Sequence, residues 1–155
     1  PKEKTPRLVV IRGDKGSWKI PTRYYSGSYA TISTARDYMR FEQMLANGGT
    51  LFGNRLISKE SVELMSTNKV GELHGNVDKG GKIEGVGFGY TVGITIDPEL
   101  SNSPRGEGAF GWGGAAGTVS WSEPKRELTV VLMVQQPTKE VPDELAKVVS
   151  AAIVD

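Results

Sequence analysis

The glycine-rich run from Gly111 to Gly117, continued by alternating residues up to Trp121, constrains this chain more than any other feature. A tight turn at Glu123–Arg126 follows it, and a strongly β-forming run covers residues 128–134. Two such runs on either side of a turn predict a β-hairpin whose first strand covers 111–121. Because glycine has no side chain to pack, several in one strand mark a place where a ligand or another segment approaches the backbone. A crowded crossing of two strands explains the pattern equally well.

Composition excludes several classes of protein. The chain has 155 residues, which suits one domain or part of a larger one, and its net charge is only +1. Basic residues are not clustered, which argues against nucleic acid as the main partner. No apolar run approaches the roughly 18 residues that a membrane-spanning helix needs, so no membrane segment is predicted. There is no cysteine, so thiolate chemistry is excluded, and the compartment, whether periplasmic, secreted or cytoplasmic, stays open.

The whole chain, 1–155, is interpreted as one segment with three parts. Residues 1–30 form an irregular lead-in, 31–67 a helical part, and 86–155 a sheet with a closing helix. The loop between the last two carries the single histidine, His74. Without a second histidine or a cysteine it cannot build a zinc site, so we interpret it as a solvated surface residue. No metal or other cofactor is predicted.

Two helices are predicted in the helical part, over residues 33–46 and 59–67. Ser33 or Thr34 can cap the first helix and Ser58 the second, because these side chains satisfy free N–H groups of a first turn. Two glycines after the first helix can adopt the left-handed conformation that ends a helix.

The remainder predicts a sheet and a final helix. A strand over 86–96 precedes the two hairpin strands, and Pro142 suits the first position of the closing helix. Apolar residues at helical spacing should pack that helix on the sheet; they are Leu145, Val148, Val149, Ala152 and Ile153. The order of helix, helix, three strands and helix lacks βαβ alternation. It predicts an α+β fold with an antiparallel sheet, the C-terminal helix packed on it, and two further helices.

Three short motifs do not support the chemistry they suggest. Residues 106–111 match G-x-G-x-x-G but lead into a strand, so no helix N-terminus is available for a phosphate. Two segments match the Ser-x-x-Lys pattern of penicillin-recognising enzymes. Ser66 lies where a helix ends rather than where one starts, and Ser122 precedes a proline that prevents the required helical turn.

A series of segments resembles the serine β-lactamase-like hydrolases. This group includes class C β-lactamases, family VIII carboxylesterases and penicillin-binding-protein-like enzymes. The segments are STARDYMRF (33–41), MLANGG (44–49), NRLIS (54–58), LMSTN (64–68), GFGY (87–90) and FGWGGAAGT (110–118). The resemblance covers about 24–136 and, more loosely, the last helix. It implies a partial β-lactamase/transpeptidase-like fold.

The resemblance also implies a role for the glycine-rich segment. Family members carry a Ser-x-x-Lys nucleophile element, a Tyr-x-Asn element, and a Lys-Thr-Gly element or variant on a strand beside the nucleophile. Only the third has a match here, Trp112-Gly113-Gly114. By resemblance these three residues bind substrate, and the Ala115 N–H is one of two oxyanion donors. Tryptophan in place of lysine removes a cation, which favours ester or amide substrates other than β-lactams.

The two missing elements lie upstream in the family. The chain is therefore expected to be the C-terminal part of a bacterial serine hydrolase, and its start at Pro1 rather than methionine fits the middle of a longer protein. Its expected partners are the N-terminal part that carries the nucleophile, a small ester or amide substrate, and a second copy that pairs with an open sheet edge. The alternative is a noncatalytic binding module that has kept the fold.

Overall fold

A computed structural model describes residues 32–73, 84–135, 137–138 and 140–153. The chain divides into two units between Ile32 and Ser33, and all elements named below belong to the second unit. The predicted lead-in over 1–30 and His74 lie outside the described residues.

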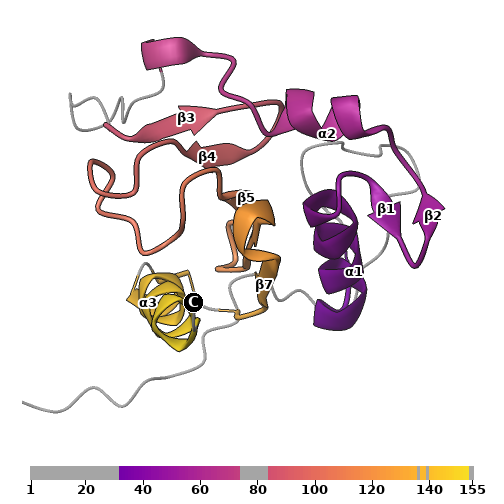
Figure 1. Ribbon diagram of the computed structural model, residues 1–155. Helices are drawn as coiled ribbons and strands as arrows, with labels where there is room; N and C mark the ends of the chain where they lie inside the picture. Colours follow the sequence, from indigo (N-terminus) through magenta and orange to yellow (C-terminus); the bar gives the residue numbers. More distant parts are fainter. Residues whose placement is uncertain (1–31, 74–83, 136, 139, 154–155) are drawn as a thin grey trace, which may run out of the picture. The chain divides into compact units, whose positions relative to one another are not determined.

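The described elements begin with a part that holds two helices and a small strand pair, continue with a run of strands, and close with a third helix (Figure 1). The helices are α1 (Ala35–Ala46), α2 (Lys59–Met65) and α3 (Glu140–Ala152), with short 3-10 helices η1 (Gly71–Leu73) and η3 (Pro124–Arg126). The strands are β1 (Thr50–Leu51), β2 (Asn54–Arg55), β3 (Val86–Phe88), β4 (Gly93–Thr95), β5 (Phe110–Gly113), β6 (Val119–Glu123) and β7 (Leu128–Leu132).

The main sheet is antiparallel throughout, in the order β3-β4-β5-β6-β7, and β1 and β2 form a separate pair. Each strand therefore lies beside its neighbour in sequence, which short connections allow. The predicted α+β class with an antiparallel sheet and a C-terminal helix is confirmed.

The prediction of three strands was wrong, because two predicted strands are each a hairpin. The segment 111–121 turns back at Gly114–Gly117, where Gly117 adopts a φ of 100°. The segment 86–96 turns at Tyr90 and Thr91, where Thr91 adopts a φ of 71°. Positive φ is uncommon in residues other than glycine, so a threonine at position 91 does not predict a turn. The predicted hairpin around residues 123–126 is confirmed as β6, η3 and β7.

Helix α1 begins and ends as its sequence predicts. The Thr34 side chain accepts a hydrogen bond of 3.1 Å from the Asp37 N–H, so Thr34 rather than Ser33 is the N-cap. Gly48 and Gly49 follow the helix with φ of 60° and 92°. A side chain at Gly49 would collide with the Ile57 carbonyl oxygen, so only glycine fits this stop. Helix α2 is capped by Ser58 as predicted.

The sheet buries one apolar cluster against each face, with α1 on one side and α3 on the other (Figure 1). The α1 side holds Met44, Leu45, Val62, Val92, Ile94 and Phe110. The α3 side holds Ala109, Trp121, Val130 and Ala146, with Val119, Leu128, Leu145 and Val149 packed around them. Register explains the division, because Phe110 and Trp121 occupy neighbouring pairs of the ladder and so face opposite ways.

Two details of α3 differ from the prediction. Pro142 is the third residue of the helix, not the first. A proline is tolerated there because the N–H groups of the first helical turn have no carbonyl acceptor within the helix, so the missing N–H costs no hydrogen bond. Val148 is 64% exposed and Ala152 is also exposed, so the predicted apolar stripe is wrong at these two positions. Ala146, which is buried, packs against the sheet instead.

A carboxyl group is buried between α1 and β6. Glu42 is 3% exposed, and the fully buried Ser122 hydroxyl donates to its Oε2 at 2.8 Å. Burial raises the pKa of the Glu42 carboxyl, and hydrogen bonds from Ser120 and Ser122 only partly oppose this. The folded protein therefore favours the neutral acid more than the unfolded chain does.

Glu42→Gln tests this buried acid. A pKa raised by folding contributes stability that is present below the unfolded value, 4.5, and is lost as pH rises through the folded pKa. Glutamine has no charge to bury. The unfolding free energy of the variant minus that of the parent should therefore increase as pH rises from 4 toward 8. Urea unfolding across this range measures the difference. Glu99→Gln, at an exposed carboxyl, is the control; a difference that stays constant with pH for Glu42→Gln contradicts the prediction.

Candidate functional site

The glycine-rich segment forms the end of β5 and the turn that follows it. Gly113 pairs with Val119 as the last rung of the β5–β6 ladder. The Gly114 N–H donates to the Thr118 carbonyl at 2.7 Å, and the Gly117 N–H donates to the Gly114 carbonyl at 2.9 Å. Trp112 and Gly113 thus lie on the strand, whereas Gly114 and Ala115 lie in the turn. All four are exposed.

The Ala115 N–H lies beyond the ladder. Within the described residues neither it nor the Ala116 N–H donates a hydrogen bond, whereas the N–H groups of Gly114 and Gly117, which flank the two alanines, are bonded inside the turn. An exposed N–H held in a bonded turn can donate to an acceptor that comes from outside the chain.

The glycines of this segment divide between the two interpretations of the sequence. A side chain at Gly111 would collide with the Ser120 carbonyl oxygen and lie 2.6 Å from the Trp121 Cα, so Gly111 permits a close strand crossing. A Cβ at Gly113 would lie 3.5 Å from its nearest neighbour, the Thr118 oxygen, which is ordinary contact. Steric crowding therefore explains why residue 111 is a glycine. It does not explain Gly113, where the backbone is open to the approach of a ligand.

Trp112 is 58% exposed and forms one side of an aromatic group. Its ring meets the Phe88 ring edge to face, with centroids 5.2 Å apart and planes at 77°. A Cβ at Gly93 would lie 3.6 Å from the Trp112 ring, so the indole covers the β4 backbone. Phe88 was not singled out in the sequence, because its contact with Trp112 joins residues far apart in the chain.

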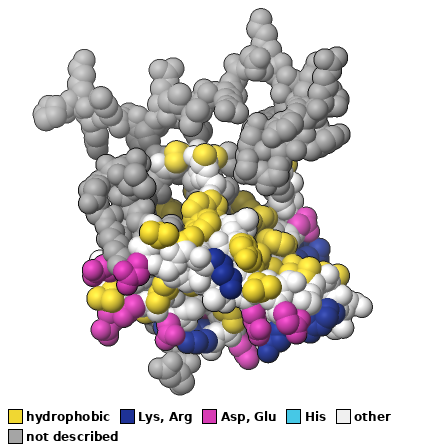
Figure 2. Space-filling model, turned by 90° about the horizontal axis from the view of Figure 1, so that it is seen from above, with side chains coloured by type: hydrophobic (Ala, Val, Ile, Leu, Met, Phe, Trp, Pro, Cys, Tyr) yellow, Lys and Arg dark blue, Asp and Glu magenta, His cyan; other side chains and the backbone are white. Residues whose placement is uncertain are grey.

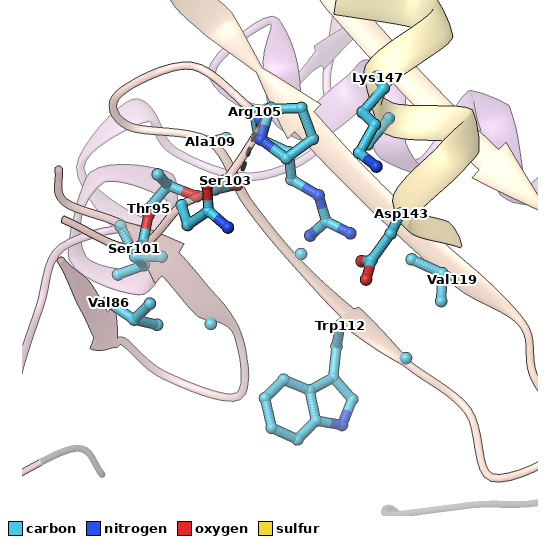
Figure 3. A pocket seen from close by; sticks show the side chains of 17 residues that line it. Val86, Thr95, Ser101, Ser103, Arg105, Ala109, Trp112, Val119, Asp143 and Lys147 are labelled. Carbon is cyan, nitrogen blue, oxygen red and sulfur yellow. Dashed lines mark hydrogen bonds between the residues drawn. The ribbon is translucent and has the colours of Figure 1, made fainter. Parts of the chain in front are cut away.

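Trp112 and Gly113 also line a cavity of about 550 Å³ between the sheet, the loop over residues 101–105 and α3 (Figure 3). The volume lies within the 300–1,000 Å³ typical of small-molecule sites. The cavity extends from Trp112 toward Arg105 and Asp143, which the sequence did not single out.

Neither Ser-x-x-Lys match is placed for nucleophilic chemistry. Ser66 is the C-cap of α2, and its hydroxyl donates to the Val62 carbonyl at 2.9 Å. Ser122 is fully buried against Glu42 on the β6 strand. These placements agree with the conclusion from the sequence that neither match supports Ser-x-x-Lys chemistry.

The described residues contain neither a metal-binding cluster nor a membrane-spanning helix. No group of three or more histidine, cysteine, aspartate or glutamate side chains there could hold a metal ion. None of the helices described is long and apolar enough to cross a bilayer.

Comparison with known proteins identifies the family to which this fold belongs. The Beta-lactamase family matches residues 1–154, so the chain belongs to the β-lactamase-like serine hydrolase family. Two proteins of Mycobacterium tuberculosis, Uncharacterized protein MT1414 of strain CDC 1551 and Protein Rv1367c of strain H37Rv, are each 38% identical to it over 120 residues. The match covers 74% of this chain but 30% of either relative.

A solved structure shows the same fold. EstCE1, described as a hydrolase with promiscuous acyltransferase activity, superposes with a TM-score of 0.62 at 22% identity. The superposition covers 75% of this chain and 29% of EstCE1. The chain thus spans less than a third of the length of the proteins it matches.

Proposed function

We propose that this chain is the C-terminal part of a serine hydrolase that cleaves esters or amides through an acyl-enzyme. In this proposal it supplies the substrate-side strand, Trp112–Gly114, and one oxyanion donor, the Ala115 N–H. The nucleophile and its base come from an upstream part of the same enzyme. The 30% coverage of both mycobacterial relatives supports a longer parent protein.

The observation that carries the proposal is the unbonded, exposed Ala115 N–H. Attack on an ester or amide carbonyl places negative charge on its oxygen, and a fixed N–H stabilises that charge best when it needs no reorganisation. The hydrogen bonds of Gly114 and Gly117 hold the turn on both sides of Ala115. The open backbone at Gly113 and the exposed Trp112 ring leave room for a substrate along the strand.

The 155-residue chain alone should not turn over p-nitrophenyl acetate or a chromogenic cephalosporin. Acyl transfer needs an activated nucleophile beside its base, and neither Ser66 nor Ser122 is placed for that role. Turnover should appear when the chain is joined to an upstream part that carries Ser-x-x-Lys at a helix start. Activity of the chain alone that Ser66→Ala or Ser122→Ala abolishes would contradict the proposal. An inactive joined protein would favour the noncatalytic module.

Self-association through a sheet edge is a second expectation for the isolated chain. Strand β7 ends the sheet order, and no described strand pairs with its outer side. Unpaired strand edges invite pairing with another chain. Apolar side chains are also exposed over the middle of the face shown in Figure 2, with charged groups toward its lower edge.

Light scattering at increasing concentration should therefore show dimers or larger species of the 155-residue chain. Leu132→Lys places a charge at the end of the β7 edge, where the leucine is half-buried, and should shift the equilibrium toward monomer. A chain that stays monomeric at high concentration contradicts the expectation. A longer parent protein that is monomeric would indicate that its upstream part covers this edge.

A further inference from the structure

The side chain of Asn68 joins the segment after α2 to strand β3. Asn68 lies two residues beyond the C-cap of α2 and is half-buried. Its Oδ1 accepts hydrogen bonds from the Val70 N–H at 3.2 Å and the Phe88 N–H at 3.3 Å, while its Nδ2 donates to the Gly71 carbonyl at 2.9 Å. Two N–H groups and one carbonyl therefore fix the orientation of this amide.

The bond to Phe88 goes beyond what a turn needs. The bond from Val70 closes an Asx turn, which is a common local role of asparagine. The bond from Phe88 joins residues that lie 20 positions apart and has no part in that turn. The Phe88 backbone is held a second time, because the Lys69 N–H donates to its carbonyl at 2.8 Å. Asn68 and Lys69 thus bind both polar backbone groups of Phe88 on β3, which ends the sheet order.

Glycines on either side of Phe88 allow this close contact. A Cβ at Gly87 would lie 2.7 Å from the Asn68 Cγ, closer than real Cβ contacts come. A side chain at Gly89 would collide with the Met65 carbonyl oxygen. The end of α2 and the Asn68 side chain therefore lie directly against the backbone of β3, and they leave Phe88 little freedom to shift.

Phe88 in turn meets the proposed substrate strand. Its ring packs edge to face on the Trp112 ring, with centroids 5.2 Å apart. Strand β4 lies between β3 and β5, and its Gly93 is paired with Phe88 on one side and Gly111 on the other. Because Gly93 has no side chain, the two rings can meet across β4. A tryptophan that is 58% exposed has a wide choice of rotamers unless a neighbour restrains it, and the Phe88 ring is such a neighbour.

We propose that Asn68 is a positioning residue, which holds the Trp112 ring through Phe88 in the orientation that meets the substrate. This role rests on the function proposed above, in which Trp112 belongs to the substrate-side strand. The alternative is that Asn68 only closes the turn after α2. In that case its loss lowers the stability of the chain and leaves the site unchanged.

The first test does not depend on activity and uses the 155-residue chain. NOE cross-peaks between the ring protons of Phe88 and Trp112 report their contact in solution. Asn68→Leu has a similar size but no acceptor for the Phe88 N–H, so these cross-peaks should weaken and the Trp112 ring signals should move. Asn68→Asp loses the bond to Gly71 but keeps an acceptor oxygen, and should restore both. The ring signals of the fully buried Trp121 are the internal reference and should not move.

Two further variants control this test. Thr67→Val removes a hydroxyl that donates to the Glu63 carbonyl, so it disturbs the end of α2 without touching β3, and the Trp112 signals should stay in place. If Asn68→Leu does not fold, Asn68→Ser replaces it, because a hydroxyl that is one atom shorter does not reach both Val70 and Phe88. Asn68→Ser should then displace the Trp112 signals in the same way.

The second test measures the site in the chain joined to its upstream part. Asn68→Leu should raise KM about 2- to 10-fold, the range expected for loss of one aromatic contact. The value of kcat should stay nearly unchanged, because Trp112 contributes to substrate binding rather than to the transition state alone. In a Trp112→Ala background, Asn68→Leu should have no further effect on KM, since two changes that act through one contact are not additive.

The outcomes separate this role from the function on which it rests. An inactive joined protein removes the proposed function, and the NMR contact then decides by itself whether Asn68 holds Trp112. An active joined enzyme whose KM is unaffected by Asn68→Leu removes the role and leaves the function. The role is also overturned by Trp112 signals that do not respond to the folded leucine or serine variant, by an equal response to Thr67→Val, or by a rise in KM that persists in full without Trp112.

Discussion

Replacing the Ala115 peptide N–H by an ester oxygen in the complete enzyme is expected to lower kcat about 10²–10³-fold. KM should stay near its original value, because the donor acts on charge that exists only in the transition state. The substitution removes one hydrogen and leaves the side chain unchanged. Ala115→Pro also removes the donor, but its ring restricts the turn and so confounds the result. Semisynthesis of the chain, joined to its upstream part, provides the enzyme for the assay.

The matched control is the same ester substitution at Gly117. That N–H is bonded to the Gly114 carbonyl at 2.9 Å, so its loss should lower the stability of the turn. The folded fraction of the Gly117 variant should then keep a kcat well above that of the Ala115 variant. Equal losses of kcat in both would mean that turn geometry rather than an oxyanion contact is being measured. An Ala115 ester with nearly unchanged kcat removes Ala115 from the site.

Trp121→Ala is expected to lower the unfolding free energy by about 3–5 kcal/mol, the largest stability effect foreseen for this chain. Trp121 is fully buried and belongs to the α3-side cluster. Its indole N–H donates to Glu123 at 2.9 Å, and Arg105 stacks on its ring. Removal leaves a cavity beneath α3 and takes a donor from a carboxyl that is only 4% exposed. Urea unfolding followed by circular dichroism measures the change.

Trp112→Ala is the natural comparison, because it removes the same side chain one rung along the neighbouring strand. Trp112 is 58% exposed and loses mainly its contact with Phe88, so the loss of stability should be about 1 kcal/mol or less. Trp121→Phe keeps an aromatic ring but removes the hydrogen bond to Glu123. Its loss of unfolding free energy should lie between those of Trp121→Ala and Trp112→Ala. Similar losses for both alanine variants would contradict the division into a buried and an exposed tryptophan.

The sequence by itself determined the elements whose signals are local. Thr34 and Ser58 cap helices because a hydroxyl reaches the N–H three residues later in the same chain segment. Gly48 and Gly49 end α1 because the left-handed conformation is open to glycine. The absence of βαβ alternation was enough for the α+β class, and the series of segments from residue 33 to 118 was enough for the family.

Other features were decided only by the tertiary structure, because they depend on contacts between distant residues or on backbone angles without a residue signature. Thr91 turns the chain in a conformation that its residue type disfavours, so β3 and β4 looked like one strand. Glu42 is buried against β6, where the hydroxyl of Ser122, 80 residues away in the chain, donates a hydrogen bond to its carboxyl group. Arg105 meets Trp121 only when the loop after β4 folds over the sheet, so neither this contact nor the cavity beside it had a signal in the sequence.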